Sequence, residues 1–376
     1  MDNKDEIIRT QLDVIGTLIN NNIRRMSDDL WGPPTPAKPI VKKEAPTAEK
    51  QSSPAVNDDK EEQQPPEKIE DLKAELNELV GLEGIKREVN NLINVVTIHN
   101  LRKQNGLKTV DMSLHMVFSG NPGTGKTMIA RLMARIYKSL GVLSKGQLVE
   151  VDRSGLVAGY VGQTATKTSE VIQKALGGVL FIDEAYALTN GKADNDFGQE
   201  AVDTLLKAME DNREDLVVIV AGYDGLMDEF IHSNPGLESR FNRYLHFDDY
   251  SVDEMMAILD LQLKKGQYQL DADASVAVRE YIVDANTGSI AFGNARGVRN
   301  IFERLLVAQA NRLAEDADLT KDELMTITAA DVAAARESDD KLNKVLKERA
   351  ESEAAAKQAI EELERLSAEI KAQKMD

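Results

Sequence analysis

The sequence predicts an α/β protein, built on a five-stranded parallel sheet with helices on both faces and followed by a small helical domain. Short apolar runs alternate with segments of helical periodicity between about residues 114 and 247, the order typical of parallel sheets. A glycine-rich loop lies between the first of these runs and the helix after it. Beyond Ser251 the strand signal disappears and only helical periodicity continues.

The individual elements follow from this alternation. Residues 68–104 are expected to form helices interrupted at Gly81 and Gly84. The small helical domain is expected to end with a segment at 326–335. Because ligands of parallel sheets bind at the carboxyl ends of the strands, we expect the functional site there. The expected strands are 114–119, 148–152, 178–183, 216–222 and 244–247, and the helices between them are 126–139, 165–176, 198–211 and 225–231.

Composition divides the 376-residue chain into parts. Eight of the ten prolines precede residue 67, in a stretch rich in Lys, Glu, Ser and Gln, so residues 33–67 are expected to form a disordered linker. The other expected parts are an N-terminal amphipathic helix at 1–32, the α/β domain at 68–250, the helical domain at 251–336 and a C-terminal helical tail at 337–376.

The two terminal segments are interpreted as helices without a local partner. A docking or self-association role for the first is favoured over folding back onto its own domain, and a membrane-surface role ranks third because its polar face is not strongly basic. In the tail, an exposed or loosely docked helix is favoured over a coiled coil, because Arg349, Glu353 and Ser367 interrupt the apolar seam. The N-terminal stripe consists of Ile8, Leu12, Ile15, Ile19, Ile23, Met26 and Leu30.

Charge and composition exclude several classes of function. The net charge of −18 disfavours nucleic acid as a partner without excluding it. The absence of cysteine excludes disulfides, thiolate metal sites and a cysteine nucleophile. No apolar run approaches the roughly 20 residues that span a bilayer, and Asp2, Asp5 and Glu6 stand where a secretory signal would be basic. A cytoplasmic location is therefore expected.

The glycine-rich loop predicts a site for a nucleoside triphosphate. It follows an apolar strand and opens a helix, the context in which this spacing binds phosphate. Glycines allow successive backbone N–H groups to face phosphate oxygens, and the helix adds its positive dipole end. The lysine would reach the β- and γ-phosphates, and the threonine after it would hold Mg²⁺. The predicted nucleotide-binding residues are Gly120, Asn121, Pro122, Gly123, Thr124, Gly125, Lys126, Thr127 and Met128.

Two adjacent carboxylates end the third expected strand and predict hydrolysis. Because neighbouring residues of a strand point in opposite directions, Asp183 and Glu184 could perform different tasks. Asp183 would hold Mg²⁺ through its water shell, and Glu184 would act as general base on the water that attacks the γ-phosphate.

Four segments together resemble an AAA+ ATPase: the phosphate loop, FIDEA at 181–185, NPGLESRF at 234–241 and GNAR at 293–296. More narrowly, the chain is similar to the group of CbbX/CfxQ (red-type Rubisco activase) and sporulation stage V protein K, which includes the ATPase half of the EccA proteins of type VII secretion. The resemblance covers about residues 68–336. It implies an AAA+ fold with a helical lid, ATP and Mg²⁺ as cofactors, and a homo-oligomeric ring, expected to be a hexamer.

The resemblance also assigns roles to single residues. Arg240 occupies the position of the arginine finger that reaches into the neighbouring subunit's nucleotide site, with Arg243 as the alternative. Arg296 occupies the position of the sensor 2 arginine, which contacts the γ-phosphate from the lid of the same subunit. Gly81, within Val80-Gly81-Leu82, matches the stretch that lies near adenine. The residue that orients the attacking water from the fourth strand is left open between Tyr223 and Asp224.

The segment Tyr160-Val161-Gly162 matches the pore loop of the same family. An aromatic residue on a glycine-flanked loop could grip an extended polypeptide, and a core tyrosine at a loop start is the alternative. The expected function is therefore ATP hydrolysis by a ring that remodels a protein client of unknown identity. An ATP-controlled scaffold or secretion-associated assembly factor without threading is the second interpretation, and a nucleic-acid motor is the least favoured.

Overall fold

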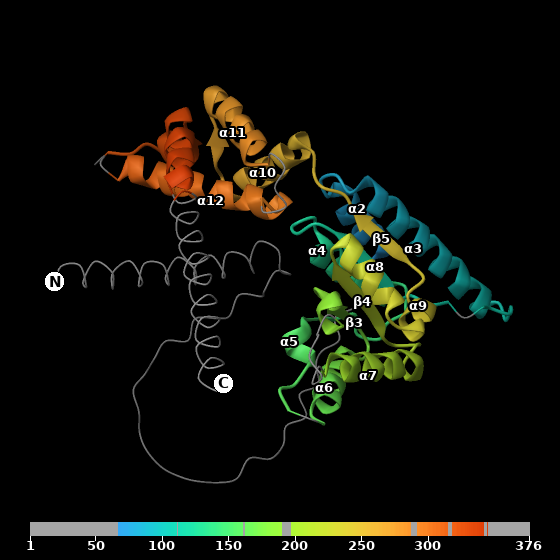
Figure 1. Cartoon of the computed structure of the whole chain (residues 1–376). Coiled ribbons are helices and arrows are strands. Elements are labelled where there is room, and N and C mark those ends of the chain that lie inside the picture. The colour runs from blue at the N-terminus through green and yellow to red at the C-terminus, as the bar shows by residue number, and fades with distance from the viewer. Residues whose placement is uncertain are drawn as a thin grey trace, which may run out of the picture. The chain divides into compact units, whose positions relative to one another are not determined.

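The computed structural model describes residues 67–110, 112–160, 162–189, 197–286, 292–314, 318–341 and 344. The expected helix at 1–32, the linker except for its last residue, and the tail after residue 341, apart from residue 344, lie outside the described residues. In the part that is described, an α/β domain precedes a mostly helical domain (Figure 1).

The α/β domain begins with α2 (Ile69–Glu78) and α3 (Glu83–Gln104). The expected interruption near Gly81 is confirmed, but Gly84 lies inside α3, because the left-handed Leu82 (φ 59°) already ends the intervening turn. All five expected strands are present. In chain order the elements are β1 (Met116–Gly120), α4 (Lys126–Ser139), β2 (Leu148–Val151), α5 (Arg153–Leu156), α6 (Thr164–Ala175), β3 (Val179–Ile182), the 3₁₀ helix η1 (Ala185–Leu188), α7 (Gly198–Asp211), β4 (Val217–Gly222), α8 (Asp224–His232), α9 (Pro235–Arg240) and β5 (Tyr244–Phe247).

The five strands form one parallel sheet in the order β2-β3-β4-β1-β5. In the register, Phe118 of β1 lies between Ala221 of β4 and Leu245 of β5. β1 is therefore internal, and the loop that follows it lies between the carboxyl ends of β4 and β5. This arrangement confirms the predicted parallel sheet and places the segments after β3, β4 and β5 beside the phosphate loop.

Both faces of the sheet are apolar, because alternate residues of each strand face opposite sides. Phe118 and Phe181 belong to a buried cluster that contains residues of α2, α3 and α4. Val117 and Leu180 belong to a second cluster, with residues of α6, α7, α8 and α9. Helices thus cover both faces, which explains why the strands are continuous apolar runs in the sequence.

The second domain contains α10 (Val252–Gly266), α11 (Ala272–Ala285), α12 (Asn294–Leu313), α13 (Lys321–Met325) and helical residues 329–341. Ser251 and Glu254 form a capping box at the start of α10. A parallel pair, β6 (Gln269–Leu270) with β7 (Thr326–Ile327), corrects the expectation that no strand follows Ser251 and that residues 326–335 are helical throughout. Two-residue strands are too short to show an alternating pattern.

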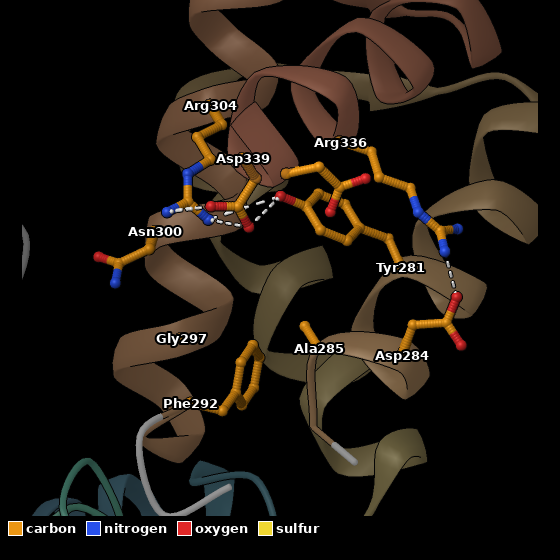
Figure 2. Close-up of a pocket in the computed structure, with 10 residues that line it drawn as sticks. Tyr281, Asp284, Ala285, Phe292, Gly297, Asn300, Arg304, Arg336 and Asp339 are labelled. Atoms are coloured by element: carbon orange, nitrogen blue, oxygen red, sulfur yellow. Dashed lines mark hydrogen bonds and ion pairs between the residues drawn. The ribbon is translucent and has the colours of Figure 1, made fainter. Parts of the chain in front are cut away.

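A cavity of about 370 Å³ lies within this domain, lined by residues of α11, α12 and the helix at 329–341 (Figure 2). The Tyr281 hydroxyl donates to Asp339 Oδ2 (2.8 Å), and Arg304 forms an ion pair with the same carboxylate (2.8 Å). Arg336 pairs with Asp284. Burial, followed by the hydrogen bond to Asp339, raises the pKa of Tyr281 to about 12. The network joins the last described helix to α11 and α12.

Candidate nucleotide site

The phosphate loop leaves the carboxyl end of β1 and enters the first turn of α4. Gly120, Gly123 and Gly125 have positive φ angles of 137°, 73° and 96°. An ideal Cβ at Gly123 would lie only 2.1 Å from the carbonyl oxygen of Gly293, at the start of α12. Glycine is therefore required at this position both by its backbone conformation and by the close approach of the helical domain.

Lys126, the first residue of α4, folds over this loop. Its Nζ donates to the carbonyl oxygens of Gly120 (2.7 Å) and Asn121 (2.8 Å). Burial lowers the pKa of Lys126, and the charges of nearby groups shift it in both directions. Asp183, Asp224 and Asp249 raise this pKa, and Arg296 lowers it. The structure thus places the predicted Asp183 and Arg296 where their charges act on the predicted Lys126.

Thr124, Thr127 and Met128 occupy the end of the loop and the first turn of α4. Thr124 is fully buried, and its hydroxyl donates to the carbonyl oxygen of Asn121 (2.9 Å). Thr127 is the second residue of α4, and the methyl group of Met128 would lie 3.3 Å from an ideal Cβ at Gly125. Thr127 therefore stands at the end of α4 where the helix dipole favours an anion.

Asp183 and Glu184 follow β3 and do not extend it, because β3 ends at Ile182. Glu184 has a left-handed backbone (φ 49°), so a turn separates the two carboxylates, and the expected strand alternation is corrected. Asp183 Oδ1 accepts the backbone N–H of Glu184 (3.0 Å), and the Asp183 N–H donates to the carbonyl of Val151 (2.8 Å). Left-handed non-glycine residues store strain and concentrate at functional sites.

Two tyrosines lie close to this turn, Tyr186 in η1 directly after it and Tyr223 at the carboxyl end of β4. The rings of Tyr186 and Tyr223 are 6.2 Å apart. Burial raises the pKa of Tyr186 to about 12, and the charge of Glu184 is the next cause. Tyr186 is thus a neighbour of Glu184 that the sequence did not identify.

Asp224 begins α8, two residues after the end of β4, and its carboxylate contacts His246 of β5. Its Oδ1 lies 2.8 Å from His246 Nδ1, while the other ring nitrogen of His246 lies 3.3 Å from Asp248 Oδ1. Of the two residues left open for orienting water, Asp224 is the one whose charge acts on Lys126.

The helical domain contributes Arg296 from the first turn of α12. Two hydrogen bonds connect this turn with the phosphate loop: Ala295 N–H donates to the carbonyl of Gly123 (3.2 Å), and Asn294 Nδ2 donates to that of Pro122 (3.2 Å). Arg296 itself is exposed.

Gly81 lies against the junction of the two domains. It has a φ of 61°, and an ideal Cβ there would lie 2.2 Å from Glu254 Oε1 and 3.3 Å from the ring of Tyr250. The hydroxyl of Tyr250 donates to the carbonyl of Thr124 in the phosphate loop (3.3 Å). The turn that contains Gly81 is therefore joined to the phosphate loop through Tyr250.

Arg240 lies away from this cluster, at the end of α9. Its guanidinium contacts Glu210 Oε2 (3.3 Å) and the carbonyl of Gly236 (3.3 Å), and its side chain is 28% exposed. Its Nε atom is buried without a hydrogen-bond partner. The alternative, Arg243, donates from Nε to the carbonyl of Ser113 (3.2 Å).

The segment that contains Tyr160 connects α5 and α6. Tyr160 is 74% exposed, Gly162 has a φ of 77°, and Val161 lies outside the described residues. The base of the segment is fixed to α6 by Lys167, whose Nζ donates to the carbonyls of Ser154 (2.6 Å) and Val157 (3.0 Å). The alternative of a core tyrosine is therefore wrong, because the ring lies largely in solvent.

Sequence reasoning missed Asp249 and Tyr250, and it quoted Asn294 without giving it a role. All three contact the phosphate loop directly. Asp249 and Tyr250 lie two and three residues after the end of β5, so the rule that sites form at the carboxyl ends of strands could have identified them.

The fold and the site define a phosphate-loop ATPase with a helical lid. The model of the ATPase family associated with various cellular activities (AAA) matches residues 116–249, and that of the AAA lid domain matches residues 251–342. The chain belongs to the AAA family, and it is accordingly an ATPase that binds adenine nucleotide.

Within that family, the chain is similar to proteins of one group. Stage V sporulation protein K of Bacillus subtilis is 42% identical, covering 72% of this chain and 84% of its own length. The chromosomal protein CbxX of Cupriavidus necator is 45% identical (71% and 85%). The chloroplastic ribulose bisphosphate carboxylase/oxygenase activase of Cyanidioschyzon merolae is 42% identical (69% and 89%). These similarities support the predicted resemblance to the CbbX/CfxQ and stage V protein K group.

A solved structure supports the fold alone. The FIGL-1 AAA domain is 19% identical, with a TM-score of 0.50, over 72% of this chain and 86% of that one. Among the described residues, no helix combines the length and the apolar character needed to cross a bilayer.

Proposed function

We propose that this ATPase works with Mg²⁺ in a homo-oligomeric ring, expected to be a hexamer, and uses hydrolysis to remodel a protein client. The observation that carries this proposal is the combination of charged groups around Lys126 with a distant aromatic residue, Tyr160, that is 74% exposed. The relatives are named for sporulation and for Rubisco activation, so the identity of the client stays open.

In the nucleotide site, Lys126 would bind the β- and γ-phosphates once phosphate oxygens replace its two loop carbonyls. Thr127 and Asp183 supply a hydroxyl and a carboxylate, the hard oxygen donors that suit Mg²⁺, which keeps most of its waters in such sites. Bound Mg²⁺ would neutralise charge on the phosphates. Glu184 would take the proton of the attacking water, and Asp224 would orient that water from the end of β4.

Substitution of Glu184 separates binding from hydrolysis. Glu184→Gln keeps the shape of the side chain but removes the base, so we expect ATP affinity within about threefold of the wild type and a turnover rate lowered about 100-fold or more. Glu170→Gln, on the exposed surface of α6, is the control and should leave both quantities unchanged. Near-normal turnover by Glu184→Gln would remove Glu184 from its proposed role.

Mixed rings test whether Arg240 acts on a neighbouring subunit. Lys126→Ala removes the nucleotide site and Arg240→Ala removes the proposed finger, so each variant alone should be inactive. In a mixed ring, some sites would combine an intact Lys126 with an intact Arg240 from the next subunit, and ATPase activity should reappear. If mixing restores no activity under conditions where subunits exchange, an action between subunits is excluded.

Tyr160 links hydrolysis to work on a client. We expect Tyr160→Ala to retain ATPase activity within about twofold, because the residue is remote from Lys126, and to lose client remodelling. Tyr160→Phe should retain both, since gripping needs the ring and not the hydroxyl. Candidate clients can be captured with Glu184→Gln in the presence of ATP. The scaffold function would be favoured if ATP hydrolysis is slow and if captured partners are bound but not altered, both by the wild type and by Tyr160→Ala.

A further inference from the structure

The junction between the two domains contains a hydrogen-bonded bridge that the roles above do not use. Asp249 lies at the end of the sheet, two residues after β5 and two before Ser251 caps α10. Its carboxylate accepts hydrogen bonds from the side-chain amides of Asn121, in the phosphate loop (2.9 and 3.0 Å), and of Asn294, at the start of α12 (2.8 Å). One carboxylate thus holds a group from each domain.

Asn294 uses its whole side chain in this bridge. Its Nδ2 donates to Asp249 Oδ1 and to the carbonyl of Pro122, and its Oδ1 accepts the backbone N–H of Tyr250 (2.9 Å). It is 6% exposed and has a left-handed backbone (φ 51°). Such a conformation is uncommon outside glycine but tolerated by Asn, so the side-chain contacts compensate for local strain.

The bridge lies directly beside Arg296. Asn294 is two residues before Arg296 in the first turn of α12, and Ala295, between them, donates its N–H to the carbonyl of Gly123. Because a helical turn is rigid, fixing Asn294 to Asp249 and Pro122 also fixes the origin of the Arg296 side chain relative to the phosphate loop. Without the bridge, the Arg296 guanidinium would have to be positioned at the cost of conformational entropy.

We propose that Asp249 and Asn294 are positioning residues that hold Arg296 over the γ-phosphate and so allow the site to distinguish ATP from ADP. This inference rests on the sensor 2 role that the family resemblance implies for Arg296, contact with the γ-phosphate in the same subunit. ADP lacks the γ-phosphate, so it would bind through the phosphate loop and Lys126 without using the bridge. Loss of the bridge should then weaken ATP binding and slow turnover while sparing ADP.

Substitution of Asp249 distinguishes the bridge from a simple effect of charge, because the two predict opposite changes in the ratio of ATP to ADP affinity. Asp249 carries a negative charge that acts on Lys126, so its removal by itself should favour the more highly charged ATP over ADP. If the bridge operates, Asp249→Ala should instead lower the ratio of ATP-analogue to ADP affinity about fivefold and lower kcat by a similar factor, with ADP affinity unchanged within about twofold. Asp248→Ala, which removes the adjacent exposed carboxylate, is the matched control and should not lower the ratio.

Exchange of the amide and the carboxylate between Asn294 and Asp249 distinguishes loss of the bridge from a general loss of structure. Asn294→Asp sets two carboxylates against each other and should lower the affinity ratio about tenfold or more. Combining it with Asp249→Asn restores one amide–carboxylate pair, keeps the net charge of the wild type and retains an acceptor for Tyr250. We expect the double variant to recover to within about threefold of the wild type. If the two side chains acted independently, the effects of the two substitutions would add, so recovery in the double variant requires that they act as a pair.

The measurements are the dissociation constants for ADP and for a non-hydrolysable ATP analogue, together with kcat and KM. Arg296→Ala, measured in parallel, separates the two proposals. If Arg296→Ala leaves the affinity ratio unchanged, the proposed role of Arg296 fails. If Arg296→Ala lowers the ratio but Asp249→Ala leaves or raises it, or if the exchange does not restore it, the bridge is overturned. A lowered ratio in both single variants with recovery in the exchange supports the bridge.

Discussion

Protonation of His115 provides a quantitative test of how the first strand is anchored beside Arg240. His115 directly precedes β1, is 6% exposed, and its Nδ1 accepts the backbone N–H of Val218 in β4 (3.0 Å). Burial, and secondarily the charge of Arg240, lowers its pKa from 6.5 to about 4. A proton on Nδ1 would break this hydrogen bond and place a second positive charge near the guanidinium.

The sign of the pH effect follows from linkage. Because the folded-state pKa lies below the unfolded-state value, the unfolded chain binds more protons between pH 6.5 and 4. Stability attributable to neutral His115 is fully present above pH 6.5 and is lost as the pH falls toward 4. One pKa unit corresponds to about 1.4 kcal/mol, so the loss amounts to about 2 kcal/mol at pH 5 and about 3 kcal/mol at pH 4.

The assay is urea unfolding followed by circular dichroism between pH 7.5 and 5, on the wild type and on His115→Asn. The Asn amide oxygen can accept the Val218 N–H but does not titrate, so all other groups contribute equally to both proteins. We expect the free energy of unfolding of the wild type to fall about 2 kcal/mol more than that of the variant. Parallel curves would refute the buried neutral histidine. In Arg240→Ala the His115 pKa, followed by NMR, should rise.

Three further outcomes are expected. Gly123→Ala should abolish nucleotide binding, because its Cβ would lie 2.1 Å from the Gly293 carbonyl oxygen. Gly84→Ala has open space around the new methyl group and should bind nucleotide normally. Isothermal titration calorimetry measures the nucleotide affinity of both variants. Asp331→Ala should destabilise the lid by about 3 kcal/mol, because the carboxylate is 1% exposed and accepts two bonds from Arg312 (2.7 and 3.0 Å). Burial raises the pKa of Asp331, but the hydrogen bonds from Arg312 and Thr328 and the charge of Arg312 together outweigh burial and lower this pKa. The difference from wild type in urea unfolding should therefore be constant at neutral pH and shrink as acid protonates the wild-type carboxylate, and a pH-independent difference would contradict this. Asp224→Ala should lower kcat about tenfold or more with little change in ATP affinity, and an equal loss in both would show that it does not act on the water.

Local chemistry made much of the fold and part of the site predictable. The strands after residue 114 are apolar because helices cover both faces of the sheet, so their positions are visible in composition alone. The phosphate loop is equally visible, since positive φ angles at Gly120, Gly123 and Gly125 require glycine. By contrast, β6 and β7 are too short for a periodic signal, and the left-handed turn at Glu184 depends on how β3 ends.

The sequence by itself determined the class of protein, because a phosphate loop is formed by consecutive residues and is therefore visible as a local motif. It determined the order of strands along the chain but not their order in the sheet. Only the tertiary structure placed the ends of β3, β4 and β5 around Lys126, joined Asp249 to Asn121 and Asn294, and left Tyr160 in solvent. The physical reason is that hydrogen bonds between distant residues and burial depend on chain topology, whereas backbone conformation and helix starts depend on neighbours in the sequence.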